Sequence, residues 1–398
     1  MRDMDTSRRT LLRTAAVLGG IAATGLAPLG RAIAGAPAIL KALPASWFVD
    51  YGTNAEMQWE SVRPGDYLTR QSRLFVRNHT ATPTIDASSY ALKVYGDGLS
   101  TARTADAPVV LTLKDLKKLP RTKLVTTHEC TGNGRSFFST QQGTPASGTA
   151  WTLGAVGTVE WEGVRLREVI EKIGINPAAV SIQATGLDAP YSTGGVDYGP
   201  VRRPFPVSKA LDDALLAWSA NGAALLPDHG YPLRLVLPGW VGIASIKWLG
   251  SLEVSLTELT SPWNTKWYRM TGPSYPADSP PLTVNPVRSA WELPWGAGLD
   301  VGRDHVLTGR SWSGAGPVVK VDVSVDGGAT WTRARIERRP RQQGWTQWSY
   351  SWTRPSAGQY VLMARATDAK GRTQPLETPF NDNGYFFDAV VRHPVTVA

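Results

Sequence analysis

The chemistry that the sequence offers is concentrated around Cys130, the single cysteine among 398 residues. A strand-like run at 123–127 leads into the sequence THECTGNGRS at 127–136, a loop that contains two glycines. A side chain at the end of a strand is held rigidly and can face a cleft, and glycines let the backbone approach a ligand closely. Because a nearby cation such as Arg135 favours the thiolate, we interpret Cys130 as a soft metal ligand or a nucleophile.

A single cysteine also limits the cofactors that the chain can hold. It permits no disulfide within the chain, no haem attached through a Cys-x-x-Cys-His motif and no cluster held by four cysteines. We therefore expect neither haem nor an iron–sulfur cluster. Two alternatives stay open at this point. Cys130 can be a small buried hydrophobic residue, or the nucleophile of a cysteine hydrolase with a histidine as its base.

The residues around Cys130 resemble a signature of the sulfite oxidase family of molybdopterin-dependent oxidoreductases. That signature is a cysteine followed by a small residue, Gly-Asn and a nearby arginine, as in Cys130, Thr131, Gly132, Asn133 and Arg135. In this family the cysteine sulfur binds molybdenum beside the dithiolene of a pterin cofactor. The resemblance implies the same role for Cys130, and a soft thiolate suits a redox-active metal.

Further segments match the family in the same order along the chain. They are FVRNH at 75–79, GTAW at 148–151, GLD at 186–188, DHGYPLR at 228–234 and SIKW at 245–248. The resemblance implies that the molybdenum–molybdopterin cofactor is held by Asn78, His79, Cys130, Asp188, His229, Arg234, Ser245, Ile246 and Lys247. The cofactor phosphate is dianionic and suits Arg, Lys and His donors.

A second set of residues is expected at the substrate. Arg77 and Arg135 would hold a sulfur oxyanion such as sulfite beside the metal, so that binding supplies proximity and orientation. Trp151 matches the tryptophan that lines the substrate pocket of the family. Tyr198 is our candidate for the active-site tyrosine of the family, and Tyr191 lies close to it in the sequence.

The resemblance implies an enzyme that oxidises sulfite to sulfate by oxygen-atom transfer and passes the electrons to an external acceptor. We expect a c-type cytochrome as acceptor, because no haem-binding domain precedes the molybdenum domain. Two alternatives within the family are a sulfoxide reductase and a sulfane dehydrogenase, which oxidises sulfur held on a carrier protein and resembles the sequence HECTGNGRSFF at 128–138. A binding or adhesion protein with a degenerate cofactor domain is the non-enzyme alternative.

One departure from the family bears on the substrate. Vertebrate-type members carry an arginine in the second domain that follows a Trp-Ser-Gly stretch and reaches the substrate pocket. The corresponding stretch here is GAGP, ending at Pro317, and it contains no arginine. One positive charge is therefore missing from the pocket, or it is supplied by Arg202, Arg203 or Arg310.

The elements that position these residues indicate an α+β part followed by an all-β part. Apolar residues at 166, 169, 170 and 173 recur at helical spacing before Gly174, which is typical of a helix and its C-cap. Apolar runs at 215–218 and 233–237 predict buried strands, and the first leads into the hairpin turn Asn221-Gly222.

The C-terminal part has the pattern of a two-sheet sandwich of immunoglobulin type. Valines at 319, 321, 323 and 325 alternate with polar residues, which predicts a strand with one buried face. A glycine turn at 326–328 and a further strand at 360–366 follow. A proline-rich segment, 272–294, connects the parts, so we place a molybdopterin-binding domain at 35–280 and a dimerisation domain at 281–398. A homodimer is expected.

Residues 1–34 have the features of a twin-arginine export signal. Arg8-Arg9 precedes a short apolar stretch at 15–29, and Ala32-Ile33-Ala34 forms a small-residue cleavage site. We expect export, to the periplasm or beyond the cytoplasmic membrane, of a protein already folded around its cofactor. The net charge of +9 favours anionic ligands or an acidic partner. Because no basic run or helix-reading motif stands out, we expect no nucleic-acid partner.

Overall fold

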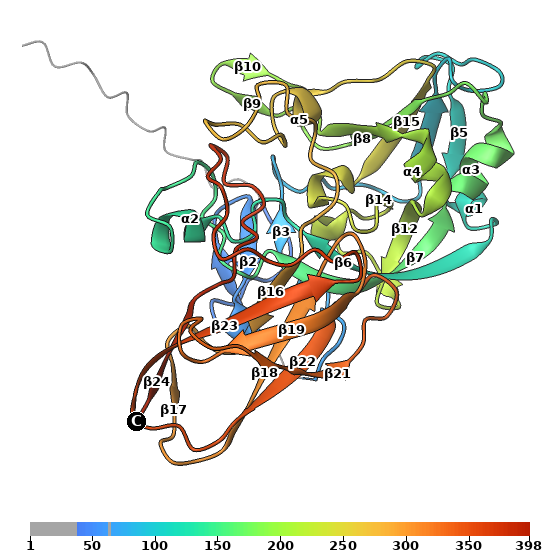
Figure 1. The fold of residues 1–398 in the computed structure, drawn as a ribbon. Helices are drawn as coiled ribbons and strands as arrows, with labels where there is room; N and C mark the ends of the chain where they lie inside the picture. The colour runs from blue at the N-terminus through green and yellow to red at the C-terminus, as the bar shows by residue number, and fades with distance from the viewer. Residues whose placement is uncertain (1–37, 63–64) are drawn as a thin grey trace, which may run out of the picture. The chain divides into compact units, whose positions relative to one another are not determined.

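The structure, a computed structural model, describes residues 38–62 and 65–398. These residues belong to one compact unit of many strands and a few short helices (Figure 1). The predicted export signal at 1–34 lies outside the described residues. No helix in the described part of the chain is long and apolar enough to cross a membrane.

The sheet that precedes Cys130 is built on the long antiparallel pair of β6 (Arg121–Glu129) and β7 (Val156–Arg165). Its order is β13-β12-β7-β6, and β14 pairs with β12. The other strands are β12 (Leu215–Ala220), β13 (Ala223–Ala224) and β14 (Arg234–Val236). Asn221 and Gly222 have φ values of 53° and 79°, as a two-residue hairpin turn requires. The predicted strands and their turn are therefore confirmed.

A second sheet has the order β11-β8-β15-β4-β5. Its strands are β4 (Ala91–Tyr95), β5 (Val109–Thr112), β8 (Ser181–Gly186), β11 (Arg202–Pro206) and β15 (Leu249–Ser255). Helix α3 (Leu166–Ile173) buries Leu166, Val169 and Ile170 in the apolar core that this sheet shares. Gly174 follows the helix with a φ of 92°. The predicted helix and its glycine cap are confirmed.

Shorter elements complete this part of the chain. A three-stranded sheet contains β1 (Phe48–Asp50), β2 (Asn54–Met57) and β3 (Val76–Arg77), and a small hairpin contains β9 (Ser192–Thr193) and β10 (Val196–Asp197). The other helices are α1 (Leu113–Leu116), α2 (Ser136–Thr140), α4 (Val207–Asp212), α5 (Pro262–Thr265), η1 (Trp59–Ser61), η2 (Pro227–His229) and η3 (Gly242–Ala244). Most of the segments singled out in the sequence therefore lie at strand ends or in loops.

The C-terminal part contains two sheets, drawn in orange and red in Figure 1. One sheet contains β16 (Arg288–Trp291), β18 (His305–Trp312), β22 (Thr346–Trp352) and β21 (Arg335–Arg338), in that order. The other contains β17 (Ala297–Leu299), β24 (His393–Val397), β23 (Gly358–Asp368), β19 (Val318–Ser324) and β20 (Thr332–Arg333), in that order. Side chains of both sheets share one apolar core, in which Trp291 and Trp348 are buried. This arrangement is the two-sheet part that the sequence predicted.

The prediction of one buried face is wrong at Val319, and also at Asp322 and Ser324, which are buried although they were expected on the polar face. The side chain of Val319 is 49% exposed, whereas Val321 and Val323 are buried. The register of β19 against β23 shifts between Val318 and Lys320. Such an irregularity changes which side of a strand faces the core, so Val318 is buried in place of its neighbour.

Candidate functional site

Two cavities meet at Cys130, just past the end of β6. Cavity 1 has about 730 Å³ and cavity 2 about 980 Å³ of unfilled space, both counted with space that is open to solvent. Arg77, Asn78, His79, Cys130 and Tyr268 line both cavities. The fold therefore brings the proposed metal ligand to the junction of two differently lined spaces.

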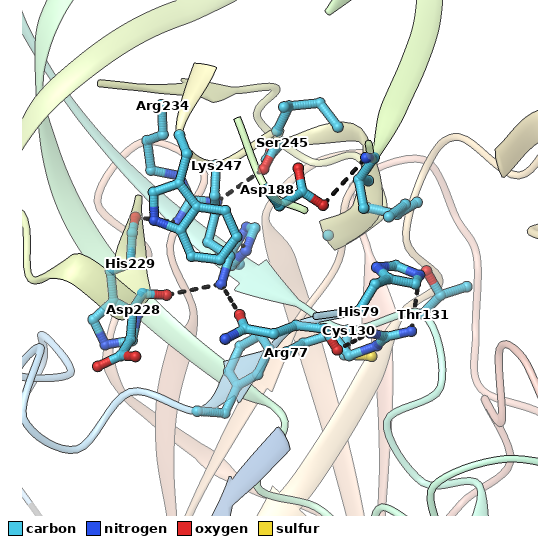
Figure 2. A pocket seen from close by; sticks show the side chains of 18 of the residues that line it. Arg77, His79, Cys130, Thr131, Asp188, Asp228, His229, Arg234, Ser245 and Lys247 are labelled. Atoms are coloured by element: carbon cyan, nitrogen blue, oxygen red, sulfur yellow. Dashed lines mark hydrogen bonds between the residues drawn. The ribbon is translucent and has the colours of Figure 1, made fainter. Parts of the chain in front are cut away.

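Cavity 1 is lined by every residue that the sequence led us to expect at the cofactor. They are Asn78, His79, Cys130, Asp188, His229, Arg234, Ser245, Ile246 and Lys247. Figure 2 shows Arg234, Lys247 and His229 on one side of the cavity, and Arg77, His79 and Cys130 together on the other. Segments that are distant in the sequence thus converge through the ends of β3, β6 and β8 and the loops around β14.

Arg234 and Lys247 are buried cations whose hydrogen-bond partners are neutral. Arg234 donates to the carbonyl oxygens of His229 and Ser245, both at 3.1 Å, and Lys247 donates to Asn78 Oδ1 and, at 2.8 Å, to the carbonyl oxygen of Asp228. Burial lowers the pKa of Arg234 to about 9 and holds the pKa of Lys247 well below its usual range. Buried charges of this kind require a counter-charge. The carboxylates of Asp228 and Asp188 act against the fall in the pKa of Lys247, and the phosphate of a pterin cofactor would provide a further counter-charge.

The lining of cavity 1 also fits a cofactor that brings metal ligands of its own. Within residues 38–62 and 65–398, no group of three or more His, Cys, Asp or Glu side chains is placed to hold a metal. Cys130 would therefore be joined by ligands from the cofactor, as a pterin dithiolene provides. The hydroxyl of Thr131, beside Cys130, lines the same cavity and is buried with no hydrogen-bond partner in the described structure. It is available to a bound group.

The histidines of cavity 1 are neutral. Burial, followed by the neighbouring Arg and Lys charges, lowers the pKa values of His79, His128 and His229 well below the usual value. His79 Nε2 lies 3.1 Å from both Arg77 Nη2 and Trp263 Nε1, which are donors, so its proton is on Nδ1.

His128 and Asp228 are among the lining residues of cavity 1 that were missed in the sequence. His128 precedes Cys130 by two positions and lies on the same side of β6, a signal that strand periodicity could have provided. Asp228 directly precedes His229 and accepts hydrogen bonds from the backbone amides of Leu40 and Lys41, at 2.9 and 2.7 Å. Nothing local in the sequence indicates that contact with the start of the described chain.

The thiol of Cys130 is affected by opposing influences. Burial raises its pKa above the usual value, and the charges of Arg77 and Arg135 act against this rise. The sequence led us to expect that Arg135 favours the thiolate; it does so, but burial has the larger effect. Binding of a metal to Cys130 would therefore displace a proton.

Cavity 2 contains the residues that were expected at the substrate, with one exception. Arg77, Arg135 and Trp151 line it as predicted. Arg135 is held at 2.8 Å by two carbonyl oxygens, those of Thr149 and Asn383. The rest of the lining combines four aromatic side chains, those of Tyr191, Trp267, Tyr268 and Tyr385, with polar residues such as Asn54, Ser147 and Thr149. The cavity can thus offer two cations to an anionic group within a largely polar lining.

Tyr198 is the exception, because it lines neither cavity. Its backbone amide donates to the carbonyl oxygen of Tyr191 at 2.9 Å, at the base of the β9–β10 hairpin, and its hydroxyl accepts from Lys266 at 2.5 Å. Only Tyr191 of this pair lines cavity 2. Tyr268, which lines both cavities, was not singled out in the sequence and is the better candidate for an active-site tyrosine.

Of the two alternatives for the missing arginine, the structure argues against its replacement by another arginine and agrees with the loss of one positive charge. The stretch ending at Pro317 lines neither cavity, and the C-terminal part reaches cavity 2 through Asn383 and Tyr385 instead. The three arginines considered as substitutes also line neither cavity: Arg202, Arg203 and Arg310. Arg203 is bound to the carbonyl oxygens of Trp263 and Leu282, and Arg310 to Glu292. The contribution of the C-terminal part to cavity 2 is therefore uncharged.

Known proteins match the chain over both of its parts. The oxidoreductase molybdopterin binding domain matches residues 79–263, and the Mo-co oxidoreductase dimerisation domain matches residues 297–397. Chicken sulfite oxidase is 34% identical over 328 residues, covering 78% of this chain and 68% of that protein. The chain belongs to the sulfite oxidase family. Membership of this family of molybdopterin-dependent oxidoreductases argues against the cysteine hydrolase alternative.

Two other relatives in the sulfite oxidase family extend the comparison. Mouse mitochondrial sulfite oxidase is 32% identical over 339 residues, covering 81% of this chain but 60% of that protein. The chain thus spans about three fifths of the mouse relative. The crystal structure of the sulfane dehydrogenase SoxCD from Paracoccus pantotrophus has a TM-score of 0.71 and 27% identity, and covers 88% of this chain and 85% of that chain.

Proposed function

We propose that this protein is an exported molybdenum oxidoreductase that oxidises sulfite to sulfate and passes the electrons to an external acceptor. The observation that carries the proposal is the junction at Cys130 of a buried cationic cavity and a cavity that presents Arg77 and Arg135. The balance is sulfite plus water to sulfate, two protons and two electrons. The sulfite oxidases that the chain resembles support the choice of substrate.

The residues of cavity 1 would hold the cofactor. Arg234 and Lys247 would bind its phosphate through charge-assisted hydrogen bonds, and Cys130 would bind its metal. The cofactor, when bound, supplies the redox centre at which an oxygen atom is exchanged with the substrate. The neutral histidines supply hydrogen bonds to its polar edges without adding charge.

The residues of cavity 2 would bind and orient sulfite. Arg77 is held by its hydrogen bonds to Asn78 and His79, and Arg135 by the two carbonyl oxygens, so both guanidinium groups are preorganised. Burial raises the pKa of Tyr268, so that its hydroxyl stays protonated and can donate a hydrogen bond to an oxyanion. The aromatic side chains in its lining would limit the contact of the bound substrate with water.

The cellular setting belongs to the same proposal. The twin-arginine pattern at 1–34 supports export, and a c-type cytochrome is the acceptor that suits an exported enzyme. The match to a dimerisation domain supports a homodimer. We also infer that the two C-terminal sheets are an immunoglobulin-like sandwich, since they share one core. We expect the protein to carry neither haem nor an iron–sulfur cluster.

A second candidate function is the oxidation of sulfur held on a carrier, as in a sulfane dehydrogenase. One observation that favours it is the uncharged Asn383 in cavity 2, because the cations of that lining are then Arg77 and Arg135. The similarity to the SoxCD structure also favours it. A sulfoxide reductase remains a third possibility in the family. Neither needs a change in the assignment of cavity 1.

Steady-state assays with the purified, molybdenum-loaded protein test the proposal. We expect sulfite to reduce ferricyanide or cytochrome c with saturation kinetics. If the molybdenum-loaded protein did not oxidise sulfite but oxidised a thiol-bound sulfur, the result would overturn sulfite oxidation and support the oxidation of carrier-bound sulfur. Oxidation of a reduced dye by a sulfoxide would instead support the reductase. Recovery of the mature protein in the periplasmic fraction tests export.

A further inference from the structure

Glu129, the residue directly before Cys130, is a buried carboxylate that faces away from the cofactor cavity. Its side chain is 2% exposed. Side chains alternate along a strand, so His128 and Glu129 point to opposite sides of β6. His128 lines cavity 1, and Glu129 contacts the C-terminal sheets. The strand that presents Cys130 is thus attached to two parts of the molecule.

Both oxygens of Glu129 are used. Oε1 accepts hydrogen bonds from Asn133 Nδ2 and from Arg288 Nη1, and Oε2 accepts one from Trp312 Nε1, each at 2.9 Å. Arg288 and Trp312 are direct cross-strand partners on β16 and β18. One rigid pair of strands therefore fixes the carboxylate from the C-terminal side.

The same network continues into the loop that holds Cys130. Asn133 donates to Glu129, and its Oδ1 accepts from the amide of Ala155 at 3.1 Å. The carbonyl oxygen of Ala155 in turn accepts from the amide of Cys130 at 2.9 Å, and the carbonyl oxygen of Cys130 accepts from the amide of Asn133 at 2.9 Å. Movement of the Glu129 carboxylate would change both ends of this loop.

We propose that Glu129 is a positioning residue, through which strands β16 and β18 set the orientation of Cys130 Sγ at the junction of the two cavities. The inference rests on the proposed role of Cys130 as metal ligand. A buried carboxylate with three donors resists rotation, because any turn of the strand end would leave a buried charge without its partners. The C-terminal part therefore acts on the metal ligand as well as on dimerisation.

The chain offers a matched control, the ion pair of Glu292 and Arg310. Its side chains are each 2% exposed, close to the 2% and 7% of Glu129 and Arg288. Arg310 lies on β18, and Glu292 directly follows β16, so both pairs involve the same region of the C-terminal sheets. Neither Glu292 nor Arg310 lines a cavity at Cys130. We expect loss of this pair to destabilise the fold without acting on the metal ligand.

The experiment compares Glu129→Gln with Glu292→Gln in the full-length, molybdenum-loaded protein. The readouts are molybdenum content, the absorption band of charge transfer from thiolate to metal, and kcat and KM for sulfite. We expect Glu129→Gln to shift or weaken the band and to lower kcat about tenfold with KM within about twofold, per bound molybdenum. Glu292→Gln should lower the thermal midpoint and leave the band and kcat unchanged. If Glu129→Gln does not fold, Trp312→Phe removes one donor and keeps a ring in place.

A wild-type band and kcat in Glu129→Gln, or in its Trp312→Phe replacement, would overturn the inference. An equal change of the band in Glu129→Gln and Glu292→Gln would also overturn the inference, because it would show a general destabilisation of the fold and no specific effect of Glu129 on Cys130. Wild-type protein without molybdenum would overturn the role of Cys130 and the inference together. Molybdenum-loaded wild-type protein that shows the charge-transfer band but does not oxidise sulfite would contradict only the proposed substrate. The charge-transfer band would then still decide the role of Glu129.

Discussion

Cavity 1 and cavity 2 share the wall around Cys130, yet they hold their cations in different ways. In cavity 1, Arg234 and Lys247 are deeply buried, and burial lowers their pKa values. In cavity 2, Arg135 spans two loops that lie far apart in the sequence, at Thr149 and Asn383, among aromatic rings. The first arrangement is costly without an anion and suits a permanently bound cofactor. In the second, burial lowers the pKa of Arg135 as well, but the neighbouring Cys130, Tyr385 and Tyr268 act against this fall, which suits a substrate that exchanges.

The largest effect should follow from a change in cavity 1. Arg234→Met removes a charge-assisted hydrogen-bond donor to the cofactor phosphate, which contributes about 1.5–3 kcal/mol and weakens retention at least about tenfold. Molybdenum and pterin content of the purified protein measure this loss. The control is Arg202→Met, since Arg202 lines neither cavity and lies over the ring of Trp263. Full molybdenum content in Arg234→Met would contradict the assignment of cofactor retention to cavity 1 and of substrate binding to cavity 2.

A change in cavity 2 should instead affect turnover at full cofactor content. Arg135→Lys keeps the charge but loses the planar guanidinium fork that reaches both carbonyl oxygens. We expect kcat/KM for sulfite to fall about tenfold, equivalent to about 1.4 kcal/mol. Steady-state kinetics normalised to molybdenum provide the measurement. Loss of molybdenum in this variant would place Arg135 with the cofactor residues.

A smaller effect is expected from adding a cation to cavity 2. Asn383→Arg adds a third positive charge to cavity 2, in the part of the lining that the C-terminal part provides and that is now uncharged. If sulfite is the substrate, its KM should fall about threefold, which corresponds to about 0.6 kcal/mol. If a carrier-bound sulfur is the substrate, the same change should leave its KM unchanged or raise it. Parallel KM measurements with the two substrates distinguish these outcomes.

The smallest effect concerns the pH dependence of stability. Without cofactor, burial lowers the pKa of Lys41 to about 7 and that of Lys247 well below its usual range. The unfolded chain then binds these protons more tightly than the folded chain, so stability rises as the pH increases from about 7 toward the usual lysine pKa. We expect the thermal midpoint of the cofactor-free protein to rise by a few degrees between about pH 7 and 9. The loaded protein should show a flatter profile, because an anion keeps Lys247 charged. If the thermal midpoint depended on pH equally in the cofactor-free and the loaded protein, this would contradict the account of cavity 1 as a cationic site that binds an anion.

The cofactor side of this arrangement could be predicted from the sequence because its residues lie in short motifs. Cys130, Arg234 and Lys247 each lie in short segments that resemble the family, and this resemblance selected them. The helix at 166–173 and the turn at 221–222 follow from spacing and from glycine. Local chemistry and local backbone geometry agree at these positions.

The substrate side could be predicted only in part. Asn383 reaches cavity 2 from a part of the chain more than two hundred residues after Cys130, and no local pattern predicts such a contact. Tyr191 and Tyr198 lie at the base of the same hairpin, and spacing alone did not select the one that lines the cavity. Val319 is exposed because strand register shifts beside it, and register depends on pairing with β23.

The most direct test of the central claim is X-ray absorption at the molybdenum edge, for wild-type protein and for Cys130→Ser purified with its cofactor. The account predicts that the metal of the wild-type protein has one more sulfur ligand than that of Cys130→Ser, and that only the wild-type protein has the thiolate charge-transfer band. An equal number of sulfur ligands in the two proteins would show that Cys130 does not bind the metal, and would contradict the account at the junction of the two cavities.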